Sequence, residues 1–256
     1  MKGFAAVTKR EIRSYLSSTI IYVFIAMFTL VCGYFFYRNF IYFTVLSLQS
    51  DYGTGGSAVL NIGEAVFRPV HSNYLFVMLI VVPLITMRVF SEEKKSGTLE
   101  LLLSYPVSYL DVVLAKLVSA FLVLLTAILL TSFFPLVVSF YGAFEVVPVL
   151  TSYLGLALVG LSFVSIGTFF SSLTENQIIA AIITFGVILL LWALEWTAAF
   201  VPGTVGRIMS GMSVYNHFGD FNRGVINTND MLFFINITIF FAALTLLNLQ
   251  RRTWKG

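Results

Sequence analysis

The chain has 256 residues, of which 59% are hydrophobic and 11% are charged, and its formal net charge is +3. Soluble domains are about 45–50% apolar and about 25% charged, so this chain lacks the polar groups needed to cover a soluble surface. The composition therefore excludes a soluble enzyme, a nucleic-acid-binding domain and a disordered chain. The single cysteine, Cys32, excludes a disulfide framework within the chain.

The N-terminal segment, residues 1–18, has the pattern of an amphipathic helix. Apolar side chains recur near helical spacing, and the basic residues Lys9, Arg10 and Arg13 occupy the other side. Such a helix lies in the headgroup region of a membrane. Two interpretations remain open: a basic leader that only sets the topology, or a connecting helix on which a cytoplasmic partner acts.

Six runs of 19 residues or more contain no Asp, Glu, Lys or Arg. Because a helix rises 1.5 Å per residue, about 20 residues cross a hydrocarbon core of about 30 Å. Stretches such as residues 122–130 are continuously apolar and lack the alternation of a β-barrel. We predict an all-α polytopic membrane protein with one transmembrane domain over residues 1–256 and spans at about 19–38, 72–90, 117–140, 148–170, 178–199 and 231–250.

The basic residues set the orientation of the spans. Six spans place both termini on one side, and that side then holds 11 of the 15 Lys and Arg residues. Cytoplasmic segments carry the excess of Lys and Arg in membrane proteins. We therefore expect a multi-pass protein of the bacterial cytoplasmic membrane with both termini in the cytoplasm.

The segment between spans 2 and 3 holds the densest group of charges. Two glutamates and two lysines at 92–95 are followed by a leucine-rich stretch that Pro106 ends. We predict a cytoplasmic helix over residues 92–103 in which Leu99, Leu102 and Leu103 share one face, while Glu93 and Glu100 offer charge to a partner. A solvated loop with a short interfacial helix is the alternative, and the pattern alone does not choose between them.

Small residues recur along the fourth span, where Gly155, Gly160 and Gly167 permit a close approach of another helix. Gly167 and Ser171 also have the spacing of a small-xxx-small pair. This packing is expected either between two copies of the protein or within a single chain.

Two segments on the outer side, at about 40–71 and 201–230, are too small to be independent domains. They contain the two histidines, His71 and His217, which we interpret as interfacial residues rather than metal ligands. The sequence contains neither a P-loop nor the zinc-protease and serine-hydrolase motifs. A membrane-embedded enzyme therefore lacks a plausible catalytic pair.

Residues 90–108, FSEEKKSGTLELLLSYPVS, strongly resemble the signature of ABC-2 type transporter permeases, in which a lysine before the next span, here Lys116, follows. The segments at 171–177 and 216–226 are similar to the same family. Within it, the chain looks most like the gliding-motility-associated branch.

The resemblance implies a permease subunit of an ABC exporter. ATP and Mg would bind to a separate ATPase, and this chain would hold no catalytic residue, cofactor or metal. A coupling helix would seat in the ATPase, and Gly97 would let the chain turn tightly before this helix. Residues 2–17 would form the connecting helix, and the segment at 216–226 would belong to the outer surface. The residues implied are, for ATPase coupling, Glu92, Glu93, Lys94, Lys95, Gly97, Thr98, Leu99, Glu100, Leu103 and Pro106; for the connecting helix, Lys9, Arg10 and Arg13; and for the outer segment, His217, Asp220 and Arg223.

The family builds one pathway from twelve spans, so this six-span chain is expected to pair with a second permease as a homodimer or a heterodimer. Membrane lipid and a periplasmic accessory protein are further expected partners. The alternative function is a non-transporting membrane anchor that transmits ATP-driven movement to a periplasmic partner of an envelope or motility machine.

Overall fold

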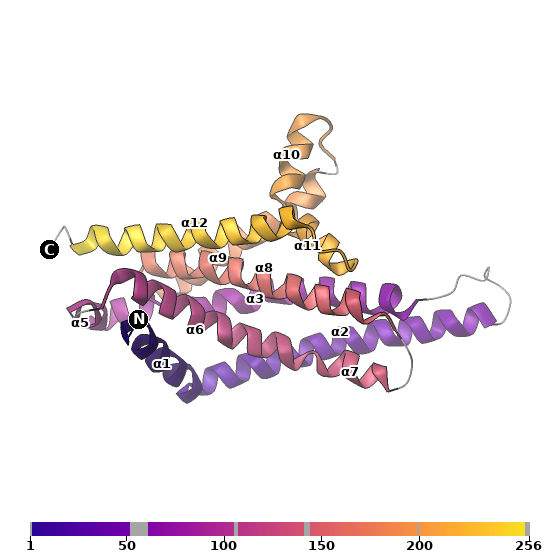
Figure 1. The fold of residues 1–256 in the computed structure, drawn as a ribbon, viewed down its shortest axis with the longest axis horizontal. Helices are drawn as coiled ribbons and strands as arrows, with labels where there is room; N and C mark the ends of the chain where they lie inside the picture. The colour runs from indigo at the N-terminus through magenta and orange to yellow at the C-terminus, as the bar shows by residue number, and fades with distance from the viewer. Residues whose placement is uncertain (1, 52–60, 105–106, 141–143, 199, 254–256) are drawn as a thin grey trace.

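The computed structural model describes residues 2–51, 61–104, 107–140, 144–198 and 200–253. Throughout these ranges the regular structure is helical, which confirms the all-α prediction (Figure 1). The elements are α1 (Lys2–Ser17), α2 (Thr19–Asp51), the π-helix η1 (Gly63–Phe67), α3 (Arg68–Thr86), α4 (Ser91–Lys95), α5 (Thr98–Ser104), α6 (Tyr109–Leu130), α7 (Phe133–Ser139), α8 (Val146–Leu173), α9 (Gln177–Ala198), α10 (Thr204–Met212), α11 (Val214–Asn222) and α12 (Thr228–Thr253).

Six helical stretches in the described residues are long and apolar enough to cross a membrane, as the hydropathy pattern predicts. The first of these helices, α2, has 33 residues and is longer than a bilayer requires. It continues to Asp51, so residues 40–51 of the predicted outer segment are helical. Lipid offers no hydrogen-bond partners to the backbone, and continuous helices satisfy those groups internally.

The long helix α8 packs against α3, α6, α9, α11 and α12 and therefore occupies the centre of the bundle. Its glycines allow this close packing. A Cβ atom at Gly155 would lie 2.7 Å from the Cβ of Phe221, and one at Gly167 would lie 2.0 Å from the Oγ1 of Thr86. The sequence left open whether these glycines pack between two copies of the protein or within one chain. Their contacts in the structure are with residues of the same chain.

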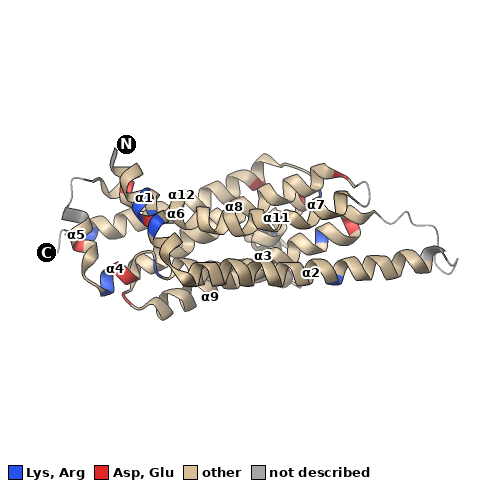
Figure 2. Cartoon of the chain, turned by 90° about the horizontal axis from the view of Figure 1, so that it is seen from below, with Lys and Arg blue, Asp and Glu red and all other residues tan. Residues whose placement is uncertain are grey.

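The start of α1 and the end of α12 lie at the same end of the bundle as α5 (Figure 1), and α4 lies at this end as well (Figure 2). We call this the polar end and define it by α1, α4, α5 and the C-terminal end of α12. Figure 2 shows charged residues gathered there, whereas the middle of the bundle carries few.

The predicted outer segment at 201–230 contains two helices. Of these, α11 packs on α8, where the Thr151 hydroxyl donates a hydrogen bond to the Phe221 carbonyl at 2.7 Å. By contrast, α10 projects away from the bundle (Figure 1). His71 is buried in α3, with its ring against those of Phe67 and Tyr153.

Candidate functional site

The segment at 91–104 forms two short helices, so the helix predicted over residues 92–103 is present on both sides of a turn at Ser96 and Gly97 but is interrupted there. The helix α4 ends as the Gly97 N–H donates to the Lys94 carbonyl, and Gly97 then takes a φ of +71°. A left-handed φ strains residues that carry a Cβ, so glycine suits this turn. After the turn, α5 begins at Thr98 with a new direction.

The two helices have a buried side and an exposed side. Leu99 and Leu102 are buried in the main core, whereas Glu92, Lys95, Gly97, Thr98 and Glu100 are exposed. Leu101 is 65% exposed. Sequence reasoning missed Leu101, although an apolar side chain between two buried leucines on a short helix has to face the other way. The side chain of Leu103 and all of Pro106 lie outside the described part of the chain.

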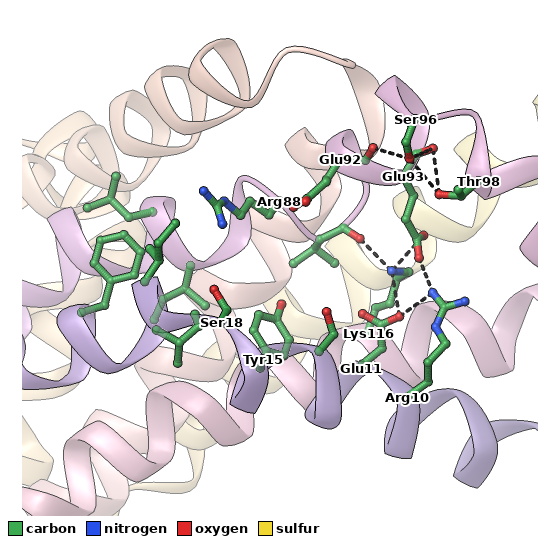
Figure 3. Close-up of a pocket in the computed structure, with 17 residues that line it drawn as sticks. Arg10, Glu11, Tyr15, Ser18, Arg88, Glu92, Glu93, Ser96, Thr98 and Lys116 are labelled. Carbon is green, nitrogen blue, oxygen red and sulfur yellow. Dashed lines mark hydrogen bonds and ion pairs between the residues drawn. The ribbon is translucent and has the colours of Figure 1, made fainter.

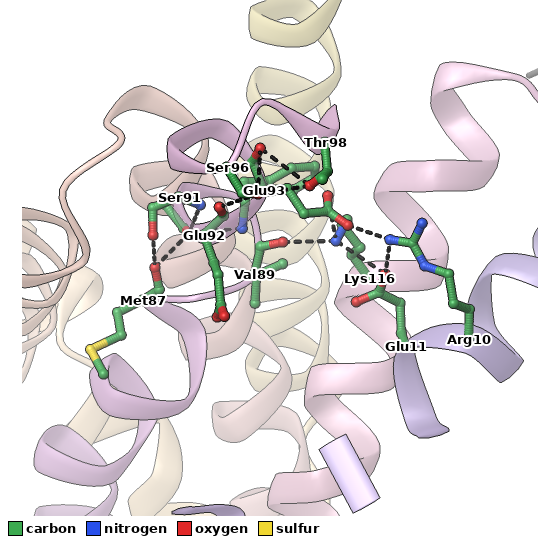
Figure 4. A network of polar contacts seen from close by, with 12 residues as sticks. Arg10, Glu11, Met87, Val89, Ser91, Glu92, Glu93, Ser96, Thr98 and Lys116 are labelled. Carbon is green, nitrogen blue, oxygen red and sulfur yellow. Dashed lines mark hydrogen bonds and ion pairs between the residues drawn. The ribbon is translucent and has the colours of Figure 1, made fainter. Parts of the chain in front are cut away.

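Glu93 points into the protein rather than outward. Its Oε2 lies 2.9 Å from Nζ of Lys116, which is 1% exposed in α6, and its Oε1 pairs with Arg10 of α1 (Figure 4). The Lys116 ammonium also lies 3.2 Å from Oε1 of Glu11 and donates to the Val89 carbonyl at 2.8 Å. We call Arg10, Glu11, Glu93 and Lys116 the charge cluster.

The charge cluster contains two cations and two carboxylates, so its formal charge is balanced. Arg10 also lies 2.9 Å from Glu11. Burial lowers the pKa of Arg10, but the carboxylates of Glu93 and Glu11 together raise it by more than burial lowers it. The pKa of Arg10 is therefore above its ordinary value. The charge cluster joins α1, α4 and α6 through ion pairs.

A second set of polar contacts anchors α4 from the side of α8. The Ser171 hydroxyl accepts hydrogen bonds from the N–H groups of Phe90 at 3.0 Å and Ser91 at 3.2 Å. Lys94 is buried, and its ammonium donates to the Ser172 carbonyl, to which Asn248 of α12 also donates at 2.8 Å. The connection at 171–177 thus begins with residues that support α4.

The predicted connecting helix α1 packs along α6. All three residues are exposed, but Arg10 also reaches the charge cluster, whereas Lys9 and Arg13 line a groove on the open side of α1. The sequence pattern treats the three basic residues alike, but the fold separates Arg10 from the other two.

The three predicted outer residues do not form one site. His217 stacks on Phe233, and its Nδ1 lies 2.6 Å from Oδ1 of Asp230 in the first turn of α12. Asp220 and Arg223 form only a long contact of 4.0 Å at the exposed surface. No group of three His, Cys, Asp or Glu side chains within the described ranges is arranged to hold a metal ion.

A family model described as "ABC-2 family transporter protein" matches residues 5–253. No curated protein matches the chain.

Proposed function

The chain belongs to the ABC-2 family of transporter proteins, and from this premise we propose that it is the permease subunit of an ABC exporter whose separate ATPase docks on α4 and α5. The observation that carries the proposal is the exposed side of this segment at the polar end. Glu92, Lys95, Thr98 and Glu100 present charged and polar groups there. Leu101 adds an exposed apolar contact in the same segment.

A docking segment transmits movement only if it is fixed to the elements that must move. In this chain α4 is fixed on two sides: Glu93 binds Lys116 of α6, and Phe90 and Ser91 bind Ser171 of α8. Separating a buried ion pair costs several kcal/mol. Because these contacts are costly to break, a displacement of α4 is expected to move α6, α8 and α1 with it.

We further propose that the polar end lies in the cytoplasm of a bacterial inner membrane. The excess of Lys and Arg at the segments near α1, α4 and the C-terminus supports this orientation. In the proposed assembly, the chain pairs with a second six-span permease, either a copy of itself or a related chain. Its proposed place in the gliding-motility-associated branch rests on the sequence resemblance.

A second candidate function is a membrane anchor that passes ATP-driven movement to a periplasmic protein. The observation in its favour is α10, which projects from the bundle (Figure 1) and exposes Val205, Ile208 and Met212. An exposed apolar strip of this kind suits a partner or the membrane interface.

The proposal is tested on the chain isolated from membranes together with its ATPase. Glu100→Lys reverses a charge on the exposed face, and Arg13→Glu is the matched reversal on α1 at the same end. The expected result is that Glu100→Lys lowers recovery of the ATPase while the amount of chain in the membrane is unchanged. Equal ATPase recovery with the wild type and Glu100→Lys contradicts docking at this face.

A transport measurement in sealed vesicles distinguishes the exporter from the membrane anchor. An exporter moves solute across the membrane only when the ATPase is active. The anchor instead predicts ATP-dependent movement of α10, measured with a spectroscopic label at Val205, without any solute transfer.

A further inference from the structure

A cavity of about 300 Å³ lies at the polar end, beside the charge cluster, between α1, α2, α3 and α4 (Figure 3). Its lining divides into two chemical halves. One half is polar and comes from α1, the turn after α3 and α4, and the other is apolar and comes from the spans α2 and α3. The polar half includes Ser14, Tyr15, Ser18, Arg88 and Glu92, and the paired members of the charge cluster close it at one end. The apolar half includes Ile20, Ile21, Phe24, Leu84 and Ile85.

Arg88 is the feature of this cavity that the rest of the protein does not explain. Its Nε is buried and has no hydrogen-bond partner within the described ranges, and no carboxylate there lies within 4.0 Å of its guanidinium. Figure 3 shows the Arg88 side chain directed away from Lys116. A buried guanidinium donor without an acceptor is unfavourable, so the site is suited to an added anion.

The geometry of a guanidinium selects among anions. Arg presents a planar fork of N–H groups that matches phosphate oxygens in a bidentate manner. Burial and the carboxylates of Glu11, Glu93 and Glu92 raise the pKa of Tyr15, so its hydroxyl stays protonated and available as a donor. The hydroxyls of Ser14 and Ser18 line the same space.

The apolar half of the cavity identifies the rest of the ligand. Ile20 is 39% exposed at the start of the first span, so this half opens toward the lipid-facing surface of α2. Free phosphate gains nothing from these side chains, whereas a phospholipid places its phosphate at the headgroup level and its acyl chains against the spans. Glu92 supplies a carboxylate that suits the ammonium of a zwitterionic headgroup.

We propose that this cavity binds the headgroup of a phospholipid, with the phosphate held by Arg88, an ammonium group facing Glu92 and the acyl chains packed on α2 and α3. The bound lipid fills the space between the connecting helix and span 2. It contributes to the position of α1 relative to the coupling segment.

The test is a titration of the full chain in mild detergent with phosphatidylethanolamine, read by native mass spectrometry. Arg88→Gln is expected to weaken lipid binding about tenfold or more, the loss expected for one charged hydrogen-bonding group. Arg88→Lys keeps the charge but not the forked N–H groups, so its lipid affinity is expected to lie between those of the wild type and Arg88→Gln. Arg13→Gln is the control, because Arg13 is exposed at the same end but outside the cavity. Equal effects of Arg88→Gln and Arg13→Gln overturn the proposal.

Two further experiments identify the ligand and the location of its binding site. Inorganic phosphate alone is expected to give no adduct, and an Arg88-dependent phosphate adduct without lipid binding overturns the lipid assignment. Phosphatidylethanolamine with a photoreactive headgroup is expected to label wild-type peptides that contain Ser14 to Phe24 or Leu84 to Glu92. Labelling confined to other peptides overturns the proposal even if Arg88→Gln does not fold.

Discussion

Replacing Lys116 by methionine tests whether the charge cluster holds α4 on the bundle. Methionine keeps most of the side-chain volume but removes the charge that lies 2.9 Å from Glu93 and 3.2 Å from Glu11. Lys116 is 1% exposed, so water cannot replace it. Removing one partner of a buried pair costs about 3–5 kcal/mol, and this is the loss of unfolding free energy that we expect.

The assay is unfolding of the purified chain in detergent micelles by denaturant. Lys95→Met is the matched control, because Lys95 is exposed on α4, and surface charges contribute about 0–1 kcal/mol. Adding Glu93→Gln to Lys116→Met removes the uncompensated carboxylate and is expected to recover about 1–2 kcal/mol. If Lys116→Met costs no more than Lys95→Met, the charge cluster does not support the fold as described.

Two further predictions concern single positions. Glu93→Lys should lower the amount of chain in the membrane, because it places a third cation in the buried charge cluster, whereas Glu100→Lys should leave that amount unchanged; immunoblotting of membranes distinguishes the two. Gly167→Ala should destabilise the chain by about 1–3 kcal/mol in the same unfolding assay, because its Cβ overlaps Thr86, whereas Gly186→Ala meets no atom within 4 Å and should be neutral or slightly stabilising; equal stability of the two variants contradicts the packing of α8.

The six spans could be predicted because the cost of burying charge in lipid is a property of composition, which the sequence displays directly. The break between α4 and α5 falls at Gly97, where the family resemblance implies a tight turn, and its φ of +71° is that of such a turn. The leucine-rich pattern over residues 92–103 indicates helix on both sides of the break but not the change of direction.

The charge cluster could not be predicted from the sequence, because its members come from parts of the chain that are far apart. Glu11 and Lys116 are 105 positions apart, and nothing local indicates that they meet. One signal was present: Lys116 interrupts an apolar helix, and a charge in such a place is costly unless it is paired. The pattern for Glu93 and Glu100 predicted a shared role at a partner surface, whereas the fold places Glu93 inside and Glu100 outside.

The predicted outer residues show the same limit. His217, Asp220 and Arg223 lie within seven positions of one another, and the family resemblance grouped them. Their helix α11 turns His217 toward Asp230 of α12, while Arg223 remains exposed. Proximity in sequence did not predict proximity of function, because a helix distributes neighbouring residues around its axis.

Disulfide crosslinking between α5 and the ATPase tests the proposed coupling most directly. A cysteine replaces Glu100 in a chain whose buried Cys32 is changed to alanine, and paired cysteines are placed along the ATPase surface. A cysteine at Glu175, in the inner connection at 171–177, and one at Val205 on α10 are the comparisons. We predict crosslinks from position 100 and none from position 205. Crosslinks from position 175 alone would contradict the assignment of α4 and α5 as the coupling segment.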